Sequence, residues 1–420
     1  MKHECRCGRR DFVKLTLGAS AGAAISAKFG LPLLAQDAAA AKAKQCILLW
    51  MAGAPSQLDT FDPKPGSDTG GPFKAIPTAA DGIEICEHLP RVAKQMRNIS
   101  LLRTVNSKDP NHDTATYMLH TGYRRAPDLE HPHIGSVVVT ELGEKVADLP
   151  GCVVLGGDPP AGAGYLSSEK GPLVLDKLEN PTEDLGEPPF VDRDRLARRN
   201  RLREWFEKDF QKDYGDDPRV EARKRAYERA NRVLTSDNLK AFEIKSEPDE
   251  TRRAYGDSDF GRAVLIARRL IQTGVRFVEV QLGDWDTHTD NFTRVKRNLG
   301  ILDPAYAALM DDLARTKLLE STLVVWMGEF GRTPGINASN GRDHFTRAWS
   351  VAMSGGGIQG GRVVGRTDEN GMAVKDRPVS VGDLYATMYK CFGIDAEKKY
   401  SAGKRPMKVL DGGEPVKELF

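Results

Sequence analysis

The segment Gly283–Phe292, GDWDTHTDNF, carries the densest group of possible metal ligands in the sequence. Three acids and one histidine stand close together there: Asp284, Asp286, His288 and Asp290. The group follows an apolar run at 275–282 that is typical of a strand, and ligands of open α/β sheets bind beyond the carboxyl ends of strands. Carboxylate oxygens and imidazole nitrogens suit divalent ions, although a polar loop with an Asx-turn and a helix cap has the same composition.

Further ionisable side chains follow other strand-like runs, at Asp59, at Glu329 with Arg332, and at Asp343 with His344. Because a buried carboxylate is costly unless it is paired or bound to metal, their recurrence at strand ends predicts one shared site. Two divalent ions there would polarise an ester oxygen and activate a nucleophile, while Arg332 would bind the anionic part of a substrate. The simpler alternatives are a local turn at Asp343 and His344 and a local ion pair between Glu329 and Arg332.

The run 111–122, NHDTATYMLHTG, begins with polar residues and then becomes apolar, which predicts a helix whose N-terminus faces this site. A helix N-terminus offers unpaired N–H groups to an anion. His112 and Thr114 stand near that end and are therefore candidate catalytic residues. His120 lies about two turns further along the helix, so we expect a structural role for it.

Apolar runs that are typical of buried strands alternate with helical patterns along most of the chain. The expected strands are 45–51, 99–105, 149–157, 275–282, 322–327 and 349–353. The expected helices are 89–95, 111–122, 134–142, 262–273, 303–317 (beginning at Asp303 and Pro304) and 381–392. This alternation predicts an α/β fold with a mainly parallel sheet flanked by helices. From about 190 to 250, charged residues dominate and apolar ones recur at helical intervals, which predicts an inserted helical cap.

The N-terminus has the pattern of a twin-arginine export signal. Arg9 and Arg10 are followed by Phe12 and Lys14, and then by a weakly apolar run at 15–27. That run is too short for a transmembrane helix, so we expect no stable membrane span. The expected partner during export is the twin-arginine translocase, and the expected location is the periplasm or another exported compartment.

The overall charge argues against nucleic acid as a partner, because 61 basic and 59 acidic residues leave a net charge of only +2 and no dominant basic field. Outside the leader, the cysteines are Cys46, Cys86, Cys152 and Cys391. They are widely scattered, without the paired spacing of a zinc finger. We interpret most of them as small buried hydrophobic residues.

The order of several motifs resembles the DUF1501 family, which is assigned to the alkaline phosphatase/sulfatase-like superfamily. The motifs are LDTFDPKP, NHDTATYMLHTG, WDTHTDNF, MGEFGRTP, GRDHF and SGGGIQGGRVVGRTD. The resemblance implies an alkaline phosphatase-like core over residues 44–420, preceded by a signal and linker at 1–43, and a binuclear metal site. It implies metal ligation by Asp59, Asp286, His288 and His344, and Glu329 and Asp343 belong to the same expected set.

Two positions depart from the superfamily pattern. Glu329 with Phe330 stands where an Asp-His pair is usual, and His112 stands where a nucleophilic Ser or Thr would be expected. His112 is therefore expected to bind metal or to act as a general acid or base. Thr114 or Thr116 replaces the nucleophile only if the helix is shifted.

Together these features predict an exported, metal-dependent hydrolase of phosphate, sulfate or related esters. Its substrate would be an anionic ester of a small molecule or a polysaccharide, and its cofactor two divalent ions of Zn, Mn, Mg, Ca or Fe. One alternative is a non-catalytic periplasmic binding or assembly protein that retains the fold and a metal site. A third possibility is an isomerase or transferase acting on a sugar or lipid headgroup beneath the helical cap.

Overall fold

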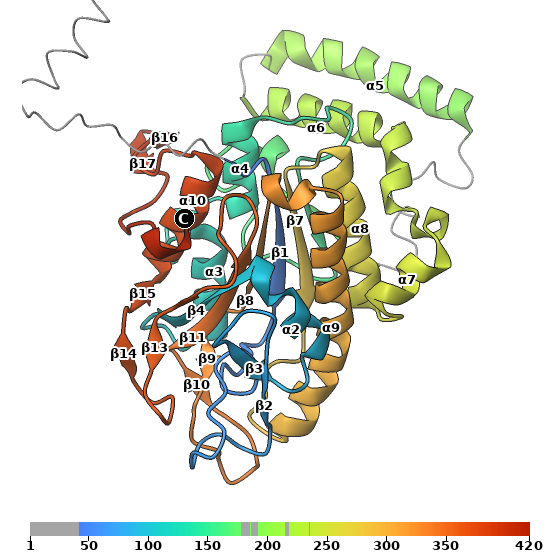
Figure 1. Ribbon diagram of the computed structural model, residues 1–420. Coiled ribbons are helices and arrows are strands. Elements are labelled where there is room, and N and C mark those ends of the chain that lie inside the picture. The colour runs from blue at the N-terminus through green and yellow to red at the C-terminus, as the bar shows by residue number, and fades with distance from the viewer. Residues whose placement is uncertain (1–41, 178–184, 186–191, 215–217, 235) are drawn as a thin grey trace, which may run out of the picture. The chain divides into compact units, whose positions relative to one another are not determined.

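Among the described residues, nine strands form the main sheet of the computed structural model (Figure 1). Their order is β12-β4-β11-β8-β1-β7-β5-β6, with β15 beside β4. The strands are β1 Gln45–Met51, β4 Ile99–Asn106, β5 Cys152–Leu155, β6 Leu173–Leu175, β7 Phe277–Leu282, β8 Thr322–Met327, β11 Trp349–Ser354, β12 Val363–Val364 and β15 Val379–Ser380. Strand β11 pairs antiparallel with β4 and β8, and the other pairings in this sheet are parallel. The predicted mainly parallel α/β sheet is therefore confirmed.

The structure describes residues 42–177, 185, 192–214, 218–234 and 236–420. The predicted export signal lies outside these residues. Within them, no helix is both long enough and apolar enough to cross a bilayer. The four cysteines outside the leader, most of which we predicted to be buried, are all buried and free, and burial raises the pKa of the Cys86 thiol to about 12.

Strand β1 shows why the sheet is buried on both faces. Its alternate side chains enter two different hydrophobic cores, Ile47 and Leu49 on one face and Leu48 and Trp50 on the other. Successive side chains of a strand point to opposite faces, so a continuous apolar run is what a sheet covered on both sides requires.

Helices cover the two faces separately (Figure 1). The first core includes residues of α2 Pro90–Gln95, α8 Asp259–Thr273 and α9 Asn291–Arg315. The second core includes residues of α3 His112–Thr121, α4 Ile134–Leu142 and α10 Val381–Phe392. Small antiparallel pairs lie outside the main sheet: β2 Ala75–Pro77 with β3 Glu84–Cys86, β9 Gly331–Arg332 with β10 His344–Phe345, β13 Arg366–Thr367 with β14 Val374–Asp376, and β16 Lys399–Ala402 with β17 Arg405–Lys408.

In its described residues, the segment expected to be a helical cap contains α5 Arg193–Tyr214 and α6 Pro218–Leu234, and α7 Asp249–Tyr255 begins at its end. Helix α6 is attached to the body of the protein, because Val233 is buried in the first core and Arg229 pairs with Glu144 at 3.5 Å. Figure 1 shows α5 on the outer side of α6.

Helix α9 begins at Asn291, so the prediction that a helix begins at Asp303 was wrong. Pro304 lies inside the helix, although an interior proline costs about 3 kcal/mol. The turns before it bury Val295, Leu299 and Leu302 completely. That burial on one face of the helix offsets the cost of the proline.

Asp303 serves a neighbouring helix instead of its own. Its carboxylate accepts hydrogen bonds from the backbone N–H groups of Arg91, at 3.0 and 3.1 Å, and Val92, at 2.8 Å. These N–H groups belong to the first turn of α2, where no intrahelical acceptor exists. One carboxylate therefore caps α2 and fixes it against α9.

This cap gives a testable prediction about stability. Replacing Asp303 with Ala leaves buried N–H groups of α2 without acceptors, so we expect the free energy of unfolding to fall by about 2 kcal/mol. Urea denaturation followed by circular dichroism measures it. Asp311→Ala, at an exposed position of the same helix, is the matched control and should change stability little. An equal loss in both variants would contradict the capping role.

Candidate metal centre

One edge of the sheet collects side chains from four separate segments. The carboxyl ends of β4, β7 and β8 lead to His112, Asp286 and Glu329, respectively. Strand β11 runs in the opposite direction, so its beginning lies at this same edge. The residues just before it, including His344 of β10, therefore join the group.

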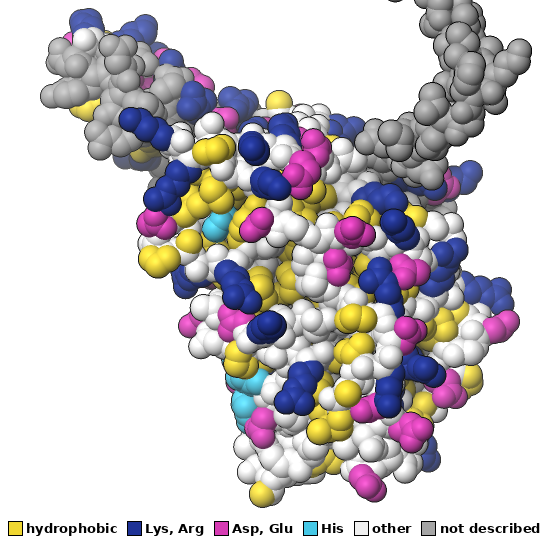
Figure 2. All heavy atoms as spheres, turned by 90° about the vertical axis from the view of Figure 1, so that its left-hand side faces the viewer, with side chains coloured by type: hydrophobic (Ala, Val, Ile, Leu, Met, Phe, Trp, Pro, Cys, Tyr) yellow, Lys and Arg dark blue, Asp and Glu magenta, His cyan; other side chains and the backbone are white. Residues whose placement is uncertain are grey.

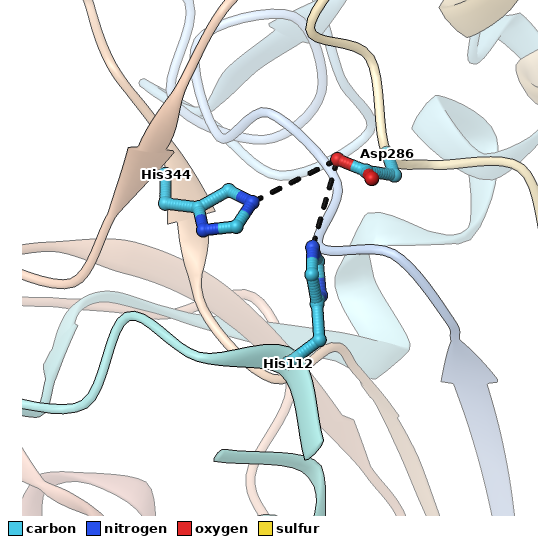
Figure 3. Close-up of side chains that lie close together, drawn as sticks. All are labelled: His112, Asp286 and His344. Atoms are coloured by element: carbon cyan, nitrogen blue, oxygen red, sulfur yellow. Dashed lines mark ion pairs between the residues drawn. The ribbon is translucent and has the colours of Figure 1, made fainter. Parts of the chain in front are cut away.

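Three side chains place their ligating atoms around one point (Figure 3). The Oδ1 atom of Asp286 lies 3.6 Å from His112 Nε2 and 3.8 Å from His344 Nε2. All three atoms lie within 4.8 Å of one another. Ligand atoms bound tetrahedrally to one zinc ion at about 2.0–2.1 Å are about 3.3 Å apart. The spacing therefore needs only small adjustments to fit a single ion.

The histidines of this edge are oriented through their Nδ1 atoms. In His112 and His344, Nδ1–H donates to an acceptor, which leaves the Nε2 lone pair for a metal ion. The contacts are His112 Nδ1 to Glu329 Oε1 at 2.6 Å, His344 Nδ1 to Pro110 O at 2.7 Å, and His288 Nδ1 to Asp343 Oδ1 at 2.7 Å. The hydrogen bond to Glu329 raises the pKa of His112, which makes its Nε2 a stronger ligand for a metal ion.

His288 is the most exposed histidine of the group, with 43% of its side chain accessible. Its Nε2 lies 2.9 Å from His344 Nε2 and 3.3 Å from Asp286 Oδ1. Two imidazole lone pairs would repel each other at 2.9 Å, so one of these nitrogens carries a proton. His288 is therefore placed to hold and release a proton.

Two buried polar atoms at this edge make no hydrogen bond within the described part of the chain, His112 Nε2 and Glu329 Oε2. Leaving such an atom unsatisfied costs about 1–3 kcal/mol. A cation bound by His112, Asp286 and His344 would satisfy the imidazole nitrogen directly. The donor set, its spacing and the unsatisfied Nε2 of His112 fit a divalent metal ion.

Arg332 holds Asp286 and has little freedom for a substrate. It is fully buried, and its Nη2 donates to Asp286 Oδ1 at 2.5 Å and to Gly53 O at 2.6 Å, while its Nε donates to Ala54 O at 3.0 Å. Burial raises the pKa of Asp286, but the charge and hydrogen bond of Arg332 outweigh burial and hold that pKa below its usual range. The structure thus places Arg332 behind the site, not in the substrate-binding position that we expected.

Two glycines allow the loops around the site to pack closely. Gly53 has φ +108°, and a Cβ there would lie 2.5 Å from the backbone nitrogen of Asp286. A Cβ at Gly341 would lie 1.9 Å from the carbonyl oxygen of His288. Any side chain at these positions would push the loop of Asp286 and His288 away from its neighbours.

Asp59 lies outside the three-residue group, although the sequence predicted it to be a metal ligand. Both of its oxygens accept from Arg342, Oδ2 from Nε at 2.8 Å and Oδ1 from Nη2 at 3.2 Å. Asn291 Nδ2 also donates to Oδ2 at 2.9 Å. Because both side chains of the pair are fully buried, the carboxylate is used in a structural ion pair.

Other predicted residues also have local partners. Thr114 makes its contacts with the Asn111 cap of α3, its Oγ1 lying 3.4 Å from Asn111 Oδ1, and it is not in the three-residue group. Glu329 and Asp343 each orient a histidine, as described above. Asp284 pairs with Arg294 and Arg297 on the surface. Asp290 is the N-cap residue of α9, but its side chain makes no capping hydrogen bond.

Two residues that support the site had no direct signal in the sequence. The carbonyl of Pro110 orients His344, and a backbone acceptor has no characteristic side chain by which to find it. Asn337 donates to His288 O at 3.0 Å and to Asp343 Oδ1 at 3.2 Å. The one sequence feature that could have pointed to Asn337 is its position in the short loop between the MGEFGRTP and GRDHF motifs.

The site opens to solvent through a pocket of about 420 Å³. Pro110, Asn111, His112, Asp113 and His344 line it. The first residues of α3 therefore form part of the pocket wall. His112 and His344, two of the three grouped residues, are accessible to solvent through this pocket.

A comparison with known proteins identifies a family. The model described as "Protein of unknown function (DUF1501)" matches residues 43–420. None of the curated proteins matches the chain.

The fold is similar to that of several solved structures. A sulfatase from Pseudoalteromonas sp. is 14% identical, with a TM-score of 0.42 over 92% of this chain and 72% of that chain. A phosphonate monoester hydrolase of Agrobacterium radiobacter is 11% identical, with a TM-score of 0.40 over 90% and 77%. A protein in the alkaline phosphatase superfamily from Vibrio parahaemolyticus is 12% identical, with a TM-score of 0.37 over 85% and 68%.

The geometry at Asp59 leads to a prediction that separates structural residues from metal ligands. Asp59→Ala leaves the Arg342 guanidinium buried without its partner, so we expect a loss of about 3–5 kcal/mol in stability with metal content unchanged in the folded protein. Chemical denaturation and elemental analysis of the same preparation measure both. Asp68→Ala, an exposed position in the same segment, is the control. A stable Asp59 variant that lost its metal would reverse the assignment.

Proposed function

The chain belongs to the DUF1501 family, whose name states no activity, and from its own side chains we propose that it is a metal-dependent hydrolase of anionic esters. The observation that carries the proposal is the convergence of His112, Asp286 and His344 beside a solvent-filled pocket. Three protein ligands with access to solvent are typical of catalytic metal sites, whereas structural sites are closed by four.

We assign one ion to this group. Asp59, which the two-ion expectation required, is engaged by Arg342. Two imidazole nitrogens and one carboxylate oxygen favour Zn, Mn or Fe over Mg and Ca, which prefer oxygen ligands. When bound, such an ion supplies Lewis acidity, which polarises an ester oxygen and makes water more acidic.

The chain's own residues would divide the remaining work. Arg332 and Glu329 hold Asp286 and His112 in their binding orientations. His288, oriented by Asp343, would take a proton from the attacking water and later give one to the leaving group. The residues lining the pocket carry no hydroxyl or thiol group, which favours water over a side chain as the nucleophile.

An anionic substrate is favoured by the position of α3. The pocket is lined by the cap residue Asn111 and by His112 and Asp113 of the first turn. The N–H groups of a first helical turn have no intrahelical acceptor and attract anions. Phosphate and sulfate esters both have the required charge, and the twin-arginine pattern at Arg9 and Arg10 leads us to propose that hydrolysis takes place after export.

The alternative is a binding protein that keeps the metal but catalyses nothing. Both functions predict bound metal, and they differ in turnover. A panel of chromogenic phosphate monoesters, phosphate diesters and sulfate esters, tested with the reconstituted protein, separates them.

Removal of a ligand is the first test. We expect wild-type protein reconstituted with Zn, Mn or Fe to retain one equivalent of metal after desalting. In His344→Ala the affinity for the metal should fall at least tenfold. Elemental analysis with circular dichroism measures metal content and folding together. His88→Ala, a partly exposed histidine that packs on Phe73 and is not one of the three grouped residues, should bind like wild type. Equal binding by His344→Ala would show that the ion is held elsewhere.

Proton transfer is the second test. In this mechanism His288 transfers a proton and does not bind the metal ion. His288→Gln should therefore keep its metal, while kcat falls by about 10²–10⁴. Asp284→Asn, a change in the same segment at a carboxylate that pairs with surface arginines, should leave kcat near that of wild type. Loss of metal from His288→Gln would make His288 a ligand. Absence of turnover with every ester, in protein that carries metal, would favour the binding function.

A further inference from the structure

A glycine-rich loop, residues 355–361, lies at the edge of the main sheet opposite the candidate metal centre. It follows β11, whose beginning lies at the metal edge, so the end of β11 and the starts of β1 and β8 share the opposite edge. Strand β1 has seven residues between the two edges, and at about 3.3 Å per residue they are roughly 20 Å apart. The proposed hydrolysis uses no residue of this loop.

The glycines of this loop allow it to pack closely against separate segments of the chain. Gly355 has φ +63°, and a Cβ there would lie 2.4 Å from the carbonyl oxygen of Leu319. A Cβ at Gly360 would lie 2.3 Å from the carbonyl oxygen of Arg97. Side chains at these positions would push the segments apart. The loop therefore draws together the residues that precede β4 and those that follow α9.

Gly357 makes room for a lysine in the same way. Its φ is +106°, and a Cβ there would lie 3.5 Å from Lys42 Cβ and 3.6 Å from Lys42 Cδ. The aliphatic stem of Lys42 thus lies along the loop. On the other side, the N–H group of Gly356 donates to Leu319 O at 2.9 Å, which ties the loop to the segment that begins at Lys317.

These segments line a pocket of about 720 Å³, which we call the basic pocket. Its basic side chains are Lys42, Lys44, Arg97 and Lys317, and its acidic side chain is Glu320. In the part of the chain that the structure describes, the ammonium groups of the three lysines have no hydrogen-bond or ion-pair partner. Like charges that gather around one cavity repel each other, and a bound anion would relieve that repulsion.

Lys317 has a backbone conformation that a lysine rarely adopts. Its φ is +60°, and it directly follows Thr316, the C-cap residue of α9. Glycine is the usual residue in this left-handed conformation after a helix, because it has no Cβ. A strained residue that is retained in this way is often a functional one. A cation is also favourable to the C-terminus of a helix, and a glycine substitution separates the two roles.

We propose that the basic pocket binds the phosphate group of an anionic ligand, either a soluble phosphate compound or the headgroup of a phospholipid. Lysine ammonium groups donate to phosphate oxygens, and their flexible stems allow several of them to turn toward one ligand. The pocket has room for more than the phosphate group itself. Among the described residues that line it, none is aromatic, so recognition rests on charge and not on ring stacking.

The first experiment is a calorimetric titration with inorganic pyrophosphate. The wild type should bind it, and combining Lys42→Gln with Lys317→Gln should raise Kd by about tenfold, since each exposed charge contributes a modest share. Lys404→Gln, at an exposed lysine between β16 and β17, should bind like wild type. His344→Ala should retain binding to the basic pocket, because the metal centre lies at the opposite edge. Equal pyrophosphate binding by the wild type and the double variant overturns the proposal.

The second experiment uses Lys317→Gly to separate ligand binding from a structural role. Glycine relieves the positive φ, so the free energy of unfolding should stay at the wild-type level or rise. The Kd for pyrophosphate should nevertheless rise by about threefold. Urea denaturation and the same titration measure the two effects. An unchanged Kd would make Lys317 a structural residue and would remove it from the proposed site.

The third experiment identifies the source of the phosphate group. If the ligand is a lipid headgroup, vesicles of phosphatidylglycerol and phosphatidylcholine should sediment with the wild type and much less with the Lys42 and Lys317 double variant. If both proteins sediment equally, or neither does, while pyrophosphate binding still depends on the two lysines, the ligand is a soluble phosphate compound. A wild type that binds neither pyrophosphate nor these vesicles overturns the proposal, and circular dichroism checks that each variant is folded.

Discussion

The buried guanidinium of Arg332 is the interaction on which the candidate metal centre depends. It binds the carbonyl oxygens of Gly53 and Ala54, which follow β1, and the carboxylate of Asp286, which follows β7. Its own backbone N–H donates to Gln57 Oε1 at 3.0 Å. Loops from separate strands are therefore tied to one rigid cation. Without it, the acid at the centre of the histidine group would have no fixed position.

The histidines are also held in fixed orientations, because the Nδ1 of each ring is hydrogen-bonded to a different acceptor. A carboxylate orients His112, a backbone carbonyl orients His344, and an exposed carboxylate orients His288. These acceptors come from separate places in the sequence, yet they leave the same ring nitrogen facing the same point. Figure 2 shows basic and acidic side chains interspersed over one face of the molecule.

The sequence predicted the sheet and most of the site because both depend on local signals. Apolar runs predicted β1 and β8 to the residue, and ionisable residues after such runs led to Asp286, His288 and His344. The start of α9 was not predictable from Asp303 and Pro304, since burial of earlier residues against a distant helix decides it. Nor could the partner of Asp59 be foreseen, because Arg342 lies 283 positions away in the chain and only the fold brings them together.

The two acid–arginine pairs of this edge show why a motif alone does not decide which acid is free to bind a metal ion. Asp59 with Arg342 and Asp286 with Arg332 have the same chemistry, and both arginines are fully buried. They differ in the exposure of the acid, which is 0% for Asp59 and 49% for Asp286. Moving an ion to the first carboxylate would require breaking a closed pair in the interior, at a cost of several kcal/mol. The second carboxylate already faces solvent and two imidazole nitrogens, so it can bind a cation while its arginine stays in place.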